Sequence, residues 1–234
     1  MLEQIFLNQQ LGPLGITNFL RHALHWGVAQ GYSLEVLLLL LLLPLALSVV
    51  AIGRYLIGFQ GLGLFTPVMM GVVFLATGLA SGLLLFLVIL LMEILVIFLL
   101  RRLKIHFMAK MALVLLIVCL VLLPLLLLLT RFRFNSVNLF NSALMPILIL
   151  ILIGENLAEV QLRKTPRKAL RATLETLILA SLAFFVLNSL VLQRMVLLYP
   201  ETMIVLVAIL DIWVGQFAGL RLLEYHRFRK LLQK

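Results

Sequence analysis

The chain has 234 residues, of which 64% are hydrophobic and only 12% are charged. A soluble domain carries about twice that share of charge, so the composition excludes an ordinary soluble enzyme and indicates a membrane protein. In a soluble protein the net charge of +10 would suggest a nucleic-acid partner. Here the cations flank apolar segments, so we predict contacts with the lipid bilayer and its anionic headgroups, and no nucleic acid.

Residues 1–33 are too polar to cross a bilayer, and they lack the basic start and the cleavage site of a signal peptide. Between Thr17 and Gln30 the apolar side chains fall on one helical face. This pattern predicts an amphipathic helix in the membrane interface, capped by Thr17. His22 and His25 lie on its polar face without a third ligand nearby, so we predict no metal site.

Seven apolar segments follow, and they predict an all-α polytopic membrane helix bundle over residues 34–222, with a basic cytoplasmic tail over residues 223–234. The second and fifth segments are short for a bilayer span. The predicted spans are Leu34–Gly53, Leu62–Thr77, Leu83–Leu100, Ala112–Thr130, Leu139–Glu155, Ala172–Leu192 and Met203–Leu222.

The distribution of lysine and arginine predicts the orientation of the bundle. With seven spans, Arg54 and the cations of residues 101–110, 163–171 and 221–234 fall on one side. The other side holds only Arg21, Arg131, Arg133 and Arg194. The positive-inside rule therefore predicts an N-terminus outside and a C-terminus in the cytoplasm.

Two proline pairs recur at nearly equal spacing. Pro44 and Pro67 lie on a full span and the short span after it, and Pro124 and Pro146 repeat this order. The recurrence favours a 3+3 inverted repeat plus one further helix, an arrangement of transporters and channels with broken helices. The alternative is that prolines recur by chance in leucine-rich helices. The predicted break or hinge residues are Pro67, Gly78, Pro146 and Gly154.

Acidic side chains occur inside the apolar segments. Glu93 and Asp211 lie near the centres of the third and seventh predicted spans, and Glu155 ends the fifth. A charge at the bilayer centre costs at least ~2.5 kcal/mol, so we expect Glu93 and Asp211 to face protein or water. Two interpretations remain open: a polar interior that handles an ion, a proton or a charged substrate group, or protonated acids that fix helix packing. For three less costly groups we favour a structural role: Asn188, Gln216 and Cys119.

The sequence contains no Ser/His/Asp set, no phosphate-binding glycine loop followed by lysine, and no cluster with metal-ligand spacing. The glycines at 58, 61 and 63 follow a membrane helix and have no dinucleotide-binding context. We therefore predict no catalytic residues and no cofactor.

Five stretches carry a resemblance: Gly58–Pro67, Thr77–Leu79, Met145–Glu155, Tyr199–Glu201 and Gly219–Arg229. They resemble a family of bacterial inner-membrane proteins with seven transmembrane helices, usually fused to an inactive transglutaminase-like domain. The last stretch is the most specific, and the similarity runs from about Ser33 to Arg229. The chain departs from the family pattern by having only a short segment in place of that domain, which would be periplasmic.

The resemblance implies a multi-pass protein of the bacterial inner (plasma) membrane. The family is similar in layout to the small integral-membrane subunit of poly-gamma-glutamate capsule synthesis, and its members are often associated with glutamate-adding ATP-grasp ligases. It thus implies a non-catalytic subunit of an envelope peptide or glutamate-polymer synthesis or export system.

Such a subunit would dock a partner enzyme. The predicted docking or lipid-binding residues are basic: Arg163, Lys164, Arg167, Lys168, Arg221, Arg227 and Arg229. Two alternatives stay open at this point. One is a stand-alone secondary transporter or channel whose path Glu93 and Asp211 line, and the other is a structural subunit of a larger membrane complex.

Overall fold

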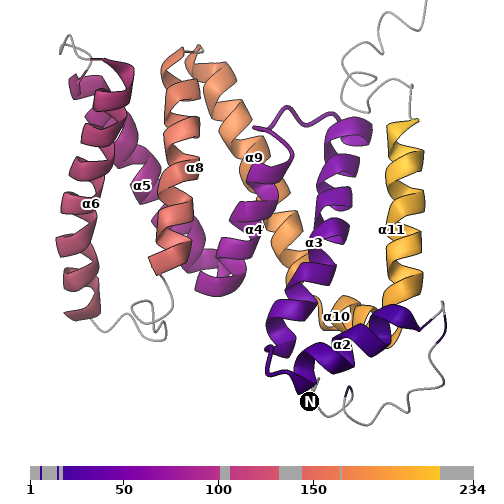
Figure 1. Ribbon diagram of the computed structural model, residues 1–234. Helices are drawn as coiled ribbons and strands as arrows, with labels where there is room; N and C mark the ends of the chain where they lie inside the picture. The colour runs from indigo at the N-terminus through magenta and orange to yellow at the C-terminus, as the bar shows by residue number, and fades with distance from the viewer. Residues whose placement is uncertain are drawn as a thin grey trace, which may run out of the picture. The chain divides into compact units, whose positions relative to one another are not determined.

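The computed structural model describes residues 6, 15, 18–100, 106–131, 144–163 and 165–216 (Figure 1). Within these residues all regular structure is helical. The chain divides into two compact units, one formed by Met1–Gly71 with Ile178–Lys234 and the other by Val72–Leu177. The boundaries fall inside helix α4 (Phe65–Thr77) and helix α9 (Pro166–Asn188), so each unit receives part of both.

In the first unit, helix α3 (Leu34–Ile52) contacts α10 (Leu190–Leu198) and α11 (Pro200–Gly215), and α11 also contacts α2 (Phe19–Ala29) (Figure 1). The leucine run of α3 continues through Pro44, whose missing N–H leaves one carbonyl of the preceding turn without its helical partner. The Ser48 hydroxyl donates to the Pro44 carbonyl at 3.0 Å. A short π-helix, η1 (Gly53–Ile57), then ends at Gly58, whose φ of 98° suits glycine.

In the second unit, helix α5 (Leu79–Leu100) packs against α6 (Phe107–Arg131) and α8 (Leu144–Arg163) (Figure 1). Gly78, with φ of 86°, separates α4 from α5. The Thr77 hydroxyl donates to the Val73 carbonyl at 2.8 Å, and the Ser81 hydroxyl donates to the Thr77 carbonyl. The last turn of α4 is thereby joined to the first turn of α5.

Several predicted spans have different limits in the structure, and the sixth and the fifth show the reasons. The sixth, predicted to reach Leu192, ends at Asn188, because Ser189 is extended and the Gln193 amide donates to the Leu187 carbonyl at 2.8 Å. The fifth, predicted to end at Glu155, continues to Arg163. No glycine or proline follows Glu155 before Arg163, and Leu157 is fully buried, so helix packing continues there.

Within the described ranges, three helices are long and apolar enough to cross a membrane: α3 with η1 (Leu34–Ile57), α5, and the Arg167–Asn188 part of α9. Helices α10 and α11, bent by 112° at their junction, make a fourth when counted as one span. Shorter apolar stretches occur in α4, α6 and α8. These helices confirm a membrane helix bundle, while the count of seven spans and the orientation stay predictions.

The predicted interfacial helix is present as α2, and it packs against the bundle. Its N-cap residue is Asn18, whereas the predicted cap, Thr17, lies outside the described residues. Leu24 and Gly27 are buried, while Trp26 is exposed.

Arg21 fixes α2 to the corner between α10 and α11. Its backbone N–H donates to the Glu201 carboxylate at 3.0 Å, and its guanidinium donates to the Leu198 carbonyl at 2.5 Å. The guanidinium also lies over the Tyr199 ring, 5.8 Å from its centroid. Glu201 is in the first turn of α11 and binds the first turn of α2, so one carboxylate lies at two helix N-termini, where negative charge is favourable.

Candidate functional site

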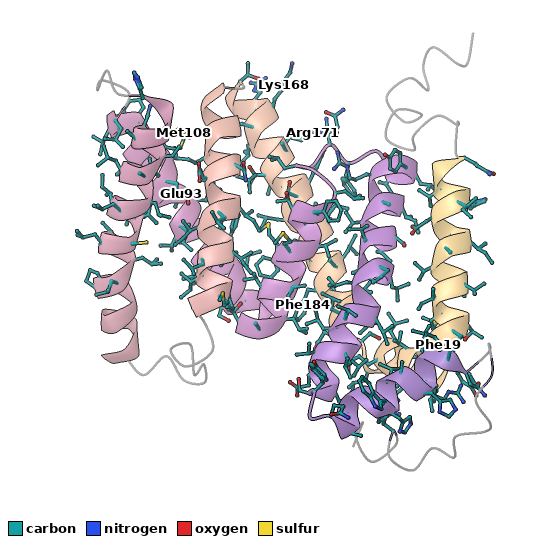
Figure 2. All side chains as sticks on the ribbon, viewed as in Figure 1. Phe19, Glu93, Met108, Lys168, Arg171 and Phe184 are labelled. Carbon is teal, nitrogen blue, oxygen red and sulfur yellow. The ribbon has the colours of Figure 1, made fainter. Side chains whose placement is uncertain are left out.

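A carboxylic acid is enclosed in the second unit. Glu93, on α5, has no exposed surface, and both of its carboxyl oxygens are buried without a hydrogen-bond partner in the described part of the chain (Figure 2). The sequence predicted that this acid would face protein rather than lipid, and the structure encloses it. A buried polar group without a partner loses its hydration with no compensation, so it requires a physical explanation.

The carboxyl group of Glu93 lies against Gly154 of α8. A Cβ atom at Gly154 would lie 2.9 Å from the carboxyl carbon and 3.0 Å from Oε1 of Glu93, and closer still to Oε2. Any residue larger than glycine would therefore occupy the space that the carboxyl group fills. Gly154 was predicted to break a helix, but it lies inside the continuous helix α8. Its lack of a side chain makes room for the carboxyl group of Glu93.

A second carboxylate follows directly in the sequence. Glu155 is half-buried and is the next residue of α8 after the glycine that contacts Glu93. Of the predicted residues, Glu93 contacts Gly154, and Glu155 interacts electrostatically with Glu93. Two carboxyl groups that interact in a medium of low polarity cannot both be ionised without repulsion.

Asp211 belongs to the other unit, on α11, and is exposed. Val207 and Val214, four residues before it and three after it, are both buried, so Asp211 lies on the side of α11 that packs on the bundle. One and two turns before Asp211 on this side, Val207 and Ile204 line an apolar groove of about 150 Å³ between α3, α10 and α11. Its walls also include Pro44, Leu45, Val196 and Pro200. Asp211 therefore follows Val207, the last residue of α11 that lines this groove, by one helical turn.

The remaining predicted hinge residues are placed as follows. Pro67 and Pro146 are both buried and lie in the first turns of α4 and α8, where a missing N–H costs nothing. Gly78 lies in the turn between α4 and α5. Asn188, Gln216 and Cys119, for which a structural role was favoured, are exposed.

Of the predicted basic residues, Arg167 and Lys168 are exposed at the start of α9. Arg171, one turn later, pairs with Glu175 at 2.6 Å. The other five lie outside the described residues, or their side chains do: Arg163, Lys164, Arg221, Arg227 and Arg229. Among the described residues, no group of three or more His, Cys, Asp and Glu side chains is placed to hold a metal ion.

Sequence reasoning missed three residues of structural importance: Gly154 as the seat of Glu93, and Arg21 and Glu201 at the corner between helices. Gly154 was noted only as a helix breaker. Its role depends on the register between α5 and α8, for which the sequence carries no signal. The contact between Arg21 and Glu201 joins positions near opposite ends of the chain.

The apolar helices, together with acids set within them, define a multi-pass helical membrane protein. The chain matches the model of a family described as 7 transmembrane helices usually fused to an inactive transglutaminase, over residues 21–232, and it belongs to this family. The resemblance found in the sequence is therefore confirmed. No curated protein and no solved structure matches the chain.

Proposed function

We propose that the protein is a non-catalytic integral membrane subunit that holds a transmembrane helix of a partner protein in the groove between α3 and α11. The observation that carries this proposal is the exposure of Asp211 on the packed side of a membrane helix. At 1.5 Å per residue, Asp211 lies about 16 Å along α11 from Pro200. That distance is about half of a hydrocarbon core roughly 30 Å thick.

An exposed aspartate at this depth requires a polar neighbour. Facing lipid at the bilayer centre would cost ~2.5 to 3.5 kcal/mol. The groove beside it is lined by apolar side chains, and Pro44 lies in its wall on α3. An apolar helix with one lysine, arginine or amide side chain at the depth of Asp211 complements both features, because its apolar face fills the groove and its polar group pairs with the carboxylate.

The family supports a partner-holding role, because its seven transmembrane helices are usually fused to a transglutaminase that is inactive. The helices of such proteins thus accompany a domain without catalysis. We place the partner in an envelope peptide or glutamate-polymer synthesis or export system of the bacterial inner membrane. The exposed Arg167 and Lys168 would contact a cytoplasmic partner enzyme or anionic lipid headgroups.

Site-specific photo-crosslinking in native membranes tests the proposal. A photoreactive amino acid at Ile204, in the groove, is compared with one at Val205, the exposed neighbour that points about 100° away along the same helix. Each is made in the wild-type background and with Asp211→Leu or Asp211→Asn. Crosslinked proteins are identified by mass spectrometry.

We expect one discrete membrane protein to crosslink from Ile204 but not from Val205. Asp211→Leu should abolish this product, and Asp211→Asn should reduce it, because an amide keeps the hydrogen bond without the charge. The proposal also requires the product to be a protein of envelope synthesis or export. Lack of a product from Ile204, or equal products from both positions, would contradict the proposal and favour a stand-alone protein such as a transporter or channel.

A further inference from the structure

We infer that Glu93 and Glu155 form a proton-binding site between α5 and α8, in which one bound proton holds the two helices together. This site lies in the unit that does not contain Asp211, and the inference does not rest on the docking of a partner. Its ligand is the proton itself. A metal cation would need several further oxygen ligands, whereas a proton needs one carboxyl group and one acceptor.

The first step of the argument is the burial of Glu93. Its side chain is fully enclosed, and neither carboxyl oxygen has a hydrogen-bond partner in the described structure. An ionised carboxylate in these surroundings would lose its hydration without gaining a cation or a donor, which is among the most costly arrangements in a protein. The enclosed cavity therefore accommodates the neutral acid, which carries a proton.

The second step is the shape of the seat. Only glycine at position 154 leaves room for the carboxyl group, since a Cβ there would lie 2.9 Å from its carbon. The contact is thus formed by the carboxyl group itself, not by the methylene groups of its side chain. A change in its charge acts directly on the surface where α5 meets α8.

The third step is the route by which a proton reaches Glu93. Glu155 follows Gly154 on α8, interacts electrostatically with Glu93, and is half-buried, so it also reaches the surroundings of the unit. Of the helices packed against α5, α8 contributes Glu155, and α6 contributes Lys110 near its start and the exposed Cys119. Among these groups, only Glu155 directly follows the residue that touches the carboxyl group of Glu93. It is the group placed to pass on the proton.

These steps give the site two states. With a proton on Glu93, the neutral carboxyl group fits against Gly154 and α5 stays on α8. Without it, Glu93 carries a negative charge in a medium of low polarity and within electrostatic reach of Glu155, and water must enter to hydrate it. Loss of the proton therefore loosens this helix contact.

Infrared difference spectroscopy of the full chain in lipid nanodiscs, titrated with alkali, tests the inference. The carbonyl stretch of a protonated carboxylic acid should be present at neutral pH and disappear at alkaline pH. Glu93→Gln should remove this band, while Glu155→Gln should keep it and shift its titration midpoint. Glu35→Gln, at an exposed acid in the first turn of α3, is the matched control and should change nothing.

Hydrogen exchange of the α8 amides gives a second reading that does not depend on band assignment. Wild-type α8 should lose protection at alkaline pH, whereas Glu93→Gln, which has the shape of the neutral acid, should keep protection throughout. The inference is overturned if the wild type shows no protonated acid at neutral pH, or if Glu93→Gln leaves the band in place. Loss of the band on addition of Na⁺ at constant pH would also overturn it, since the ligand would then be a metal cation.

Discussion

The contact between Glu93 and Gly154 leaves no room for a side chain at position 154. A carboxyl group without a hydrogen-bond partner fills a space that exists only because position 154 has no side chain. In many helix contacts glycine lets two backbones approach each other. Here it makes room for a polar group, so packing and protonation of the same acid are linked.

Substitution of Gly154 should destabilise the protein. Gly154→Ala would force the carboxyl group of Glu93 out of its place, and we expect a loss of about 1 to 3 kcal/mol in stability, as for other overpacked interiors. Gly215→Ala is the control, because a Cβ at Gly215 meets nothing within 4 Å and alanine favours a helix over glycine. Thermal unfolding in detergent should show a lower midpoint for Gly154→Ala only. Equal effects of both substitutions would contradict the claim that Gly154 makes room for the carboxyl group of Glu93.

The sequence identified Glu93 as an unusual residue, because a single acid in a long apolar segment needs no structure to be noticed. It could not identify the partner of that acid. Gly154 becomes special only through the rotation and register of α8 against α5, which many packed side chains decide together. For Asp211 the sequence predicted a place near the centre of a span, but the groove one helical turn before it depends on how α3, α10 and α11 pack.

At the scale of elements, α2 is attached to the α10–α11 corner by polar contacts as well as apolar ones. We expect Arg21→Ala to weaken this attachment by about 1.5 to 3 kcal/mol, the range for hydrogen bonds that involve a charged group. Limited proteolysis should then cleave within α2 faster than in the wild type. Arg167→Ala, at an exposed arginine at the start of α9, is the control. Cleavage at the same rate in both variants would contradict the attachment through Arg21.

The attachment of α2 should also depend on pH through His25. Its ring stacks on Phe6 at 4.0 Å, and burial, followed by the charges of His22 and Arg21, lowers the pKa of His25 below the usual 6.5. Because the folded state disfavours the charged ring, the docked helix is fully stable above pH 6.5 and loses stability as the pH falls below that value. The exposed Trp26 next to it provides a fluorescence signal for this change.

We expect the Trp26 emission to change between pH 7.5 and pH 5 in the wild type, as α2 loosens. His25→Phe keeps the stacking on Phe6 and removes the charge, so its emission should be constant over this range. A pH response that persists in His25→Phe would mean that another group is responsible.

The composition of the sequence predicts that these helices exist, but it does not predict where all of them begin and end. The apolar run through Leu192 hides the break at Ser189, because leucine and valine on both sides continue the hydrophobic pattern. The sequence does not predict the extension of α8 past Glu155, because polar residues such as those that begin there are typical of the end of a span. The contact between Arg21 and Glu201 could not be predicted either, because the sequence around each residue carries no sign of the other residue.

At the scale of the whole molecule, membership of the family and the apolar helices agree on a polytopic membrane protein. Three or four of the described helices are long and apolar enough to cross a membrane. The predicted seven crossings thus depend on the shorter apolar helices α4, α6 and α8 also entering the bilayer, which is possible when short helices are enclosed by neighbouring ones. The sidedness of the positive charges is the physical basis for that count.

Cysteine labelling from one side of sealed cells tests this account most directly. Because Cys119 is the single cysteine, Cys119→Ser gives a background for one new cysteine at a time. With an impermeant reagent we expect Gln30→Cys and Arg194→Cys to react from outside, and Gln60→Cys, Thr165→Cys and Gln233→Cys to react only after permeabilisation. Reaction of positions 30 and 233 from the same side would mean an even number of crossings and would contradict the account.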